Sequence, residues 1–246
     1  MARFFLPKEQ IQNRRGTIVG AELDHLRRVL RLGPGDTISF FDDAGWEYEG
    51  IIRSLGSDRG EIEILGAAQA RRESTLNITL ALGLTKGEKM DWVVEKATEL
   101  GVQNVVPFVS AYTVPKLDDR KIQKRAERWR KIAISAAKQC GRTHIPEILP
   151  LCAYPELIRQ AWPETLKLLF WEKEAHQSLH QVHALNRAVR SVLLVIGPEG
   201  GFNSQEAELA GEHGFKSVQL GRRILRAETA ALTATSLAQF LWGDLG

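Results

Sequence analysis

Two glycine-bearing loops near the C-terminal end of the chain contain the residues best suited to hold a small ligand. Residues 196–202 read Ile-Gly-Pro-Glu-Gly-Gly-Phe after an apolar run, and residues 220–229 read Leu-Gly-Arg-Arg-Ile-Leu-Arg-Ala-Glu-Thr. Glycine lacks a Cβ, so the backbone can approach a ligand closely, and α/β proteins bind small molecules in the loops that follow buried strands. The alternative for the first loop is a tight strand-to-helix turn without a ligand.

The second loop adds charged side chains, namely Arg222, Arg223, Arg226 and Glu228. Arginines this close in sequence repel one another unless an anion offsets their charge, and a phosphate group would do so. For Glu228 a simpler role is equally open, since a carboxylate in the first turn of a helix favours the helix dipole.

Several other kinds of site lack their sequence signatures. There is no Gly-x-Gly-x-x-Gly fingerprint of a Rossmann nucleotide site, no complete phosphate loop, and no Gly-x-Ser-x-Gly nucleophile turn. The six histidines form no His-Glu-x-x-His motif, so we expect no metal. The two cysteines, Cys140 and Cys152, form no redox or metal motif and fit a reducing compartment.

The chain divides into two regions with different patterns. Residues 1–70 alternate in short runs that predict a small β-barrel, with one helix at 21–31, and a polar stretch at 67–74 reads as a linker. From residue 74 to 246 strands alternate with helices, which predicts an α/β fold: a mostly parallel sheet with helices on both faces. The expected strands are 76–82, 104–108, 166–171, 189–196 and 217–220, and the expected helices are 88–100, 119–140, 154–161, 178–188, 204–213 and 228–242.

Positive charge is concentrated in one stretch. The net charge is only +3, yet residues 116–144 hold ten lysines and arginines against three acids. Such a segment is typical of proteins that bind a polyanion, and nucleic acid is the leading partner; a solvated helix face is the alternative. We find no signal peptide and no apolar run of membrane-spanning length, so we expect a cytoplasmic protein without a membrane partner.

Five motifs, in order along the chain, resemble the RsmE family of 16S ribosomal RNA (uracil-N3)-methyltransferases, which belongs to the SPOUT class. They are Lys86-Gly-Glu-Lys-Met-Asp-Trp-Val-Val-Glu-Lys-Ala-Thr-Glu-Leu-Gly101, Trp129-Arg-Lys-Ile132, Gln139-Cys-Gly-Arg142 with Ile145-Pro-Glu-Ile148, and the two loops described above. The resemblance covers essentially the whole chain.

The resemblance implies a fold and partners that periodicity alone does not give. It implies a PUA-like β-barrel at 1–70 for RNA docking, followed by a SPOUT domain at 74–246 whose C-terminal part forms a trefoil knot. It also implies a homodimer that uses S-adenosylmethionine to methylate N3 of one uridine in the 16S ribosomal RNA of the small ribosomal subunit. Two alternatives stay open: a SPOUT enzyme acting on another RNA base or a ribose, and a non-catalytic RNA-binding ribosome-assembly factor.

The resemblance, the chemistry of the reaction it implies and the distribution of positive charge together suggest residues for three roles. Arg226 would stabilise the uracil anion, Glu228 would be the base or orient the arginine, and Glu199 is the next candidate carboxylate. The cofactor would contact Trp171, Glu172, Gly197, Pro198, Glu199, Gly200, Gly201, Leu220, Gly221, Ile224, Leu225, Arg226 and Thr229. RNA would contact Arg3, Arg27, Arg28, Arg31, Arg120, Lys121, Lys124, Arg125, Arg128, Lys131, Gln139 and Arg142. For Arg3 the role of an ordinary strand residue is equally open.

Overall fold

The computed structural model describes residues 2–113, 118–163, 165–173 and 177–246, and their contacts divide the chain into two compact units. The first unit holds the residues up to Glu73 together with Ala137–Ile145, and the second holds Ser74–Ala136 and Pro146–Gly246. Lys116, part of the basic segment noted in the sequence, lies outside the described residues.

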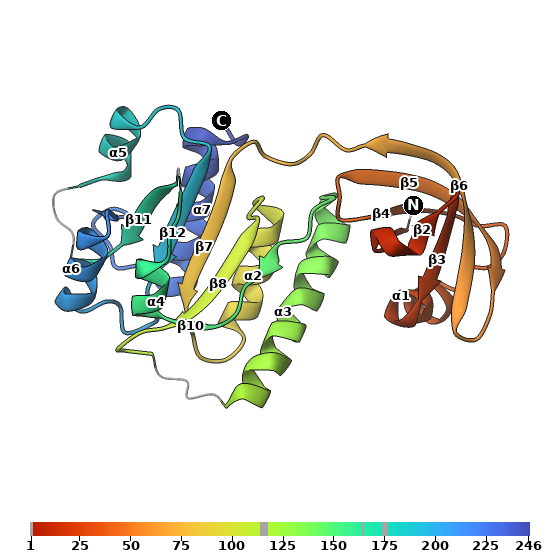
Figure 1. Cartoon of the computed structure of the whole chain (residues 1–246), viewed down its shortest axis with the longest axis horizontal. Helices are drawn as coiled ribbons and strands as arrows, with labels where there is room; N and C mark the ends of the chain where they lie inside the picture. The colour runs from red at the N-terminus through yellow and green to blue at the C-terminus, as the bar shows by residue number, and fades with distance from the viewer. Residues whose placement is uncertain (1, 114–117, 164, 174–176) are drawn as a thin grey trace. The chain divides into compact units, whose positions relative to one another are not determined.

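The first unit is built on a six-stranded mixed sheet (Figure 1). In spatial order its strands are β1 (Arg3–Phe5), β4 (Thr37–Phe41), β5 (Trp46–Leu55), β6 (Arg59–Gln69), β3 (Arg15–Val19) and β2 (Ile11–Gln12). Only β1 and β4 run parallel. Shifts of register in β5 curl the sheet, as bulges do. The small β-barrel expected here takes the form of this curled mixed sheet, whose path ends at β1 and β2.

Apolar and polar side chains alternate along these strands, and the apolar ones form the core of the first unit. Phe4, Ile18, Phe40 and Ile62 point to one side and are almost fully buried, as the period of two predicts.

The helix expected at 21–31 changes character halfway. It begins as α1 (Gly20–Asp24) and continues as a π-helical turn, η2 (His25–Val29). Leu26 is buried as predicted, but Val29 and Leu30, expected on the same face, are 65% and 39% exposed. The wider π turn rotates the residues that follow it away from the α-helical face.

The stretch expected as a linker is partly structured. β6 extends to Gln69, and Glu73 is bonded to the returning segment: its carboxylate accepts hydrogen bonds from the backbone of Thr143 and His144 and from Arg142. The end of the predicted linker is therefore held to the first unit by the hydrogen bonds of Glu73.

The second unit contains an entirely parallel sheet. The order is β10 (Cys152–Ala153), β8 (Asn104–Val109), β7 (Asn77–Gly83), β12 (Ser191–Ile196), β11 (Leu166–Phe170) and β13 (Lys216–Val218), and β9 (Glu147–Ile148) also pairs with β8. The five longer strands match the sequence predictions closely. β9 and β10 were not predicted, because two residues give no periodic signal.

Helices cover both faces of this sheet. They are α2 (Lys89–Glu99), α3 (Asp119–Cys140), α4 (Tyr154–Arg159), α5 (Leu179–Leu185), α6 (Ser204–Glu212) and α7 (Ala227–Trp242). α2 and α7 pack together, with α7 on β7 and β12, while α4 and α6 pack together, on β8 and β13 respectively (Figure 1). The predicted α/β class is confirmed.

Helix ends in the second unit follow local rules read from the sequence. Gly101 and Gly214 have φ values of +81° and +77° just past α2 and α6, a conformation that glycine adopts without strain. Asn203 and Glu206 form the expected capping box at the start of α6. Among the described residues no helix combines the length and the apolar character needed to cross a bilayer.

A buried carboxylate organises the β4–β5 hairpin of the first unit. Asp42 accepts hydrogen bonds from the backbone of Ala44 (2.8 Å) and Trp46 (3.2 Å) and from the Tyr48 hydroxyl (2.9 Å). Burial and this hydrogen bond raise the pKa of Tyr48 to about 12. We predict that Asp42→Ala lowers the free energy of unfolding of the first unit by about 2–3 kcal/mol, because three donors lose their acceptor. Urea unfolding measures the change.

The matched control for that prediction is Asp58→Ala, which removes an exposed carboxylate from another turn of the same unit. Equal stability of the two variants would contradict the role assigned to Asp42.

Candidate active site

Four loops of the second unit meet at one edge of the parallel sheet. Phe170 of β11 is in register with Ile196 of β12 and with Val218 of β13, and Ile196 is in register with Leu82 of β7. Since the strands run parallel, their carboxyl ends lie level, and the loops that leave them converge on the same place. A cavity of about 740 Å³ opens there.

The cavity gathers nearly all residues that the sequence assigned to a cofactor. The predicted residues in its wall are Trp171, Glu172, Gly197, Pro198, Glu199, Gly200, Gly201, Leu220, Gly221, Ile224, Leu225 and Arg226. Thr229 is not in the wall; it is an exposed residue in the first turn of α7. The wall also contains residues that were not predicted to contact the cofactor. They are Lys89, Phe170, Ile196, Phe202, Val218, Gln219, Arg222, Arg223, Ala227 and Ala230.

Glycine is required where the 197–201 turn crosses the end of β7. A Cβ on Gly83 would lie 2.5 Å from the Pro198 nitrogen, and one on Gly200 would lie 2.5 Å from Cβ of Tyr112. Gly201 has φ +68° and donates a backbone hydrogen bond to Pro198. The turn is therefore rigid and tightly held.

An aromatic anchor fixes the end of this turn. Phe202 is buried and packs against the rings of Phe108 and Tyr154. Its backbone carbonyl accepts a hydrogen bond from the indole of Trp171 (3.2 Å), which joins the turn to the loop after β11.

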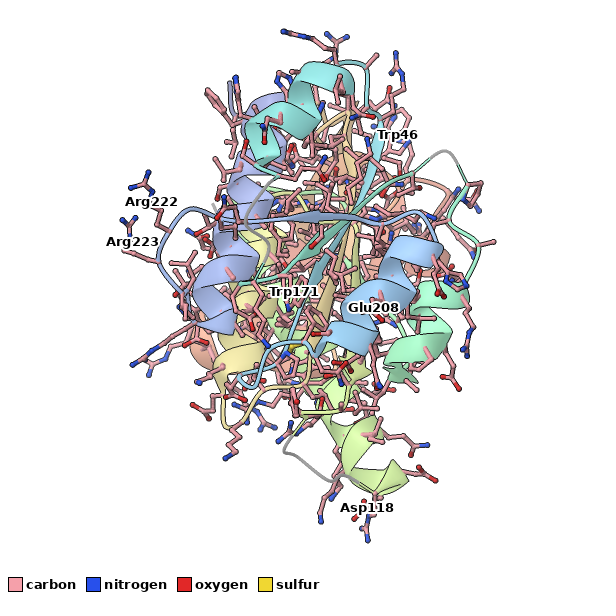
Figure 2. The ribbon with its side chains drawn as sticks, turned by 90° about the vertical axis from the view of Figure 1, so that its left-hand side faces the viewer. Trp46, Asp118, Trp171, Glu208, Arg222 and Arg223 are labelled. Carbon is pink, nitrogen blue, oxygen red and sulfur yellow. The ribbon has the colours of Figure 1, made fainter. Side chains whose placement is uncertain are left out.

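The loop before α7 presents an apolar side chain to solvent. Ile224 is 84% exposed although it lines the cavity. Leaving an isoleucine in water forgoes about 1.5–3 kcal/mol of burial, so a flat apolar ligand that covers it would gain this free energy. Figure 2 shows that Arg222 and Arg223, just before it, project outward from the same loop into solvent.

Glu199 is tied to the segment after β7. Its Oε1 accepts hydrogen bonds from Lys89 Nζ (2.9 Å) and from the Lys86 backbone (3.2 Å). Burial alone would raise the pKa of Glu199, but these hydrogen bonds outweigh it and lower the pKa below its usual value; the same contact raises the pKa of Lys89. A carboxylate with a lowered pKa is a weak proton acceptor, so Glu199 is poorly suited to be a general base.

Glu228 and Arg226 occupy the start of α7. Oε2 of Glu228 is enclosed and accepts no hydrogen bond from a described residue, and Lys89 Nζ lies 3.9 Å away. Arg226 is the N-cap residue, exposed at the cavity. A cation at the N-terminus of a helix opposes the helix dipole, so Arg226 is not placed there for stability.

Two arginines predicted to contact RNA are used inside the first unit. Arg3 donates to the carbonyls of Ala137 and Gly141 and pairs with Glu47 at 2.8 Å. The side chain of Arg142 is only 4% exposed and pairs with Glu73. Both therefore serve the packing of residues 137–145, and their present geometry does not favour contact with RNA.

The other predicted RNA contacts lie on the surface. On α3, Arg120, Lys124 and Lys131 are exposed and share one face, opposite the buried Trp129. Arg128 instead pairs with Asp91 (2.6 Å) and Glu88. The remaining predicted residues are Arg27, bonded to the Gly56 carbonyl; Arg28, paired with Asp24; Lys121, paired with Asp118; and Arg31, Arg125 and Gln139.

The described residues contain no cluster of histidine, cysteine and acidic side chains arranged to hold a metal ion.

Comparison with known proteins matches both parts of the chain. Residues 72–239 match the model of an RNA methyltransferase domain, and residues 20–65 match that of an RNA methyltransferase PUA domain. Ribosomal RNA small subunit methyltransferase E of Bacillus subtilis is 33% identical, over 98% of this chain and 96% of the relative.

Solved structures agree over the full length. A methyltransferase from Legionella pneumophila, in complex with bound S-adenosylmethionine, has a TM-score of 0.91 at 32% identity and covers 99% of both chains. Ribosomal RNA small subunit methyltransferase E from Neisseria gonorrhoeae, bound to S-adenosylmethionine, has a TM-score of 0.89 at 35% identity and covers 100% of both.

The fold and the cavity, with these matches, define an RNA methyltransferase preceded by a PUA domain. More particularly, the chain belongs to the ribosomal RNA small subunit methyltransferase E family.

The Lys89–Glu199 ion pair gives stability that depends on pH. Because the pKa of Glu199 is lowered in the folded state, its contribution is present above the ordinary value of 4.5 and is lost as the pH falls through the lowered value. Lys89, with a raised pKa, keeps its charge up to and beyond its ordinary 10.5. We predict that Glu199→Gln lowers the Tm by about 1–3 °C at pH 7 and that the difference vanishes well below pH 4.5.

Differential scanning calorimetry across this pH range tests the prediction, with Glu208→Gln as the control, since Glu208 is exposed on α6 (Figure 2). A Tm difference that persists unchanged in acid would show that the Glu199 effect does not come from its charge.

Proposed function

We propose that this chain transfers the methyl group of S-adenosylmethionine to N3 of a uridine in 16S ribosomal RNA of the small ribosomal subunit. The observation that carries the proposal is the cavity at the carboxyl edge of the sheet, which gathers the glycine turn, the apolar Ile224 and the cation Arg226. Relatives with the same architecture were solved with S-adenosylmethionine bound.

The residues of the cavity fit this cofactor. Ile224 and Leu225 offer apolar surface for an adenine ring, and the backbone of residues 197–201 and 220–221 offers hydrogen-bonding groups at close range. When bound, the cofactor supplies an activated methyl group on a positively charged sulfur. The chain's own task is then to align the acceptor nitrogen with that group and to exclude water.

The acceptor needs help because N3 of uracil carries a proton and is a poor nucleophile until it is lost. Arg226 is exposed at the cavity, and its guanidinium makes no hydrogen bond or ion pair with a described residue, so it is placed to stabilise the negative charge that develops on N3 and the neighbouring carbonyl oxygens. Glu228 is our candidate to receive the proton, since its Oε2 accepts no hydrogen bond from a described residue and lies 3.9 Å from Nζ of Lys89, a residue of the cavity wall.

Docking of the RNA is divided between the two units. We propose that the PUA unit, with Arg27, Arg28 and Arg31, recognises local ribosomal shape, and that the exposed cations of α3 bind phosphates. The boundaries we propose remain 1–70 for docking and 74–246 for catalysis. Trp92, Leu237 and Phe240 expose apolar surface on α2 and α7, which supports a homodimer. We propose a cytoplasmic location, because the proposed substrate is ribosomal RNA.

Complementation tests the function directly. The chain is expressed in a bacterial strain whose own small subunit methyltransferase E gene is deleted, and its ribosomal RNA is analysed by mass spectrometry. Wild-type protein should restore 3-methyluridine. Gly200→Val should not, because a side chain there meets Tyr112, and its affinity for S-adenosylmethionine in calorimetry should fall at least about 100-fold.

Gly211→Ala is the matched control, since a Cβ there meets nothing within 4 Å. If the wild-type protein binds the cofactor but does not restore 3-methyluridine, the proposed acceptor is wrong, and the result would favour another RNA base or a ribose as the acceptor. No cofactor binding by the wild-type protein would favour a non-catalytic assembly factor.

The phosphate-binding role of α3 predicts a salt-sensitive effect. Lys124→Glu with Lys131→Glu should weaken RNA binding and reduce the slope of log K against log salt by about 2, because two phosphate contacts are lost. Affinity for S-adenosylmethionine should stay unchanged. These two residues are better targets than Arg128, whose loss would leave Asp91 without its ion pair. Fluorescence anisotropy with a 16S fragment at several salt concentrations measures the slope, and an unchanged slope would exclude this face of α3.

A further inference from the structure

Lys89 is a cation of the cavity wall to which the mechanism above assigns no task. It is the first residue of α2 and comes from the Lys86-to-Gly101 motif. Its ammonium lies 2.9 Å from Glu199 Oε1 and 3.9 Å from Glu228 Oε2. One cation thus lies between two carboxylates that belong to different segments, the 197–201 turn and the first turn of α7.

Arg226 is the other cation of this cluster. Its positive charge is close enough to oppose the charge on Lys89. Arg226 and Glu199 both line the cavity, and Glu228 is two residues beyond Arg226 along the chain. Lys89 is the cation that contacts both carboxylates.

Building on the proposed function, we infer that Lys89 is a positioning residue that keeps Glu199 and Glu228 from pairing with Arg226, so that the guanidinium stays available to the uracil anion.

The physical reason is competition for a limited number of negative charges. Lys89 and Arg226 are balanced by Glu199 and Glu228, and a carboxylate that binds a guanidinium does so through two parallel hydrogen bonds that occupy the donors an anionic substrate would need. The Lys86 backbone N–H adds a second bond that holds Glu199 on the side of Lys89. Without Lys89, two carboxylates would face a single arginine.

The first test separates kcat from cofactor affinity. Lys89→Met should lower kcat by about 10- to 100-fold, the size expected when one stabilising donor is blocked, while the Kd for S-adenosylmethionine changes less than about threefold. Lys89→Arg should retain most of the activity. Lys96→Met is the matched control on the same helix, because Lys96 pairs with Glu95 and Glu99 away from the cavity, and kcat should not change.

The second test distinguishes this role from a purely structural one. In the Lys89→Met background, Glu199→Gln should raise kcat at least about fivefold, because it removes a carboxylate that would otherwise pair with Arg226. In the wild-type background the same change should lower kcat, because Lys89 loses its partner. A double variant no more active than Lys89→Met, or wild-type activity in Lys89→Met, would overturn the inference.

The third test does not depend on methylation. Exchange of the Arg226 Nε–H with water, followed by ¹⁵N NMR, should slow in Lys89→Met as the guanidinium pairs with a carboxylate, and recover in the double variant. Unchanged exchange would overturn the inference even if the enzyme is active. Slowed exchange in a protein that shows no methyl transfer would support the contact and refute the proposed function instead.

Discussion

The close approach of two backbones, at Gly83 and Pro198, sets the geometry of the whole site. A Cβ at position 83 would fall 2.5 Å from the proline nitrogen and 2.6 Å from its ring. Because no side chain intervenes, the 197–201 turn lies directly across the carboxyl end of β7. The segment that leaves β7 then passes beside the turn, and Lys86 and Lys89 reach Glu199 from there. This one contact therefore positions both the glycine turn in the cavity wall and the contact between Lys89 and Glu199.

The charge cluster is arranged against local stability. Arg226 lies at the N-terminus of α7, where the helix dipole disfavours a cation, and the enclosed oxygen of Glu228 accepts no hydrogen bond from a described residue. Ile224 adds an exposed apolar side chain in the same loop. A cation, an anion and an apolar side chain are thus each in an unfavourable environment within one short segment. This arrangement indicates that a ligand with charged and apolar parts completes the site.

The sequence predicted the helices and the longer strands of the second unit and the edge where its site lies, because period, caps and glycine positions are local signals. It missed Lys89, whose contact with Glu199 spans 110 positions and depends on β7 and β12 being neighbours. The motif that begins at Lys86 was the available signal. The sequence also assigned Arg3 and Arg142 to the RNA. In the structure Arg3 bonds to Ala137, Gly141 and Glu47, and Arg142 pairs with Glu73. These contacts depend on the return of the chain at 137–145, which no local pattern indicates.

That return means that neither unit is a single stretch of sequence. The chain passes from one to the other after Glu73, after Ala136 and after Ile145, and the second of these points falls inside α3. Replacing the docking part with that of another enzyme would need three splice points, one of them in the middle of a helix. Substrate preference in such a protein is therefore more readily altered by single amino-acid changes than by recombination of whole modules.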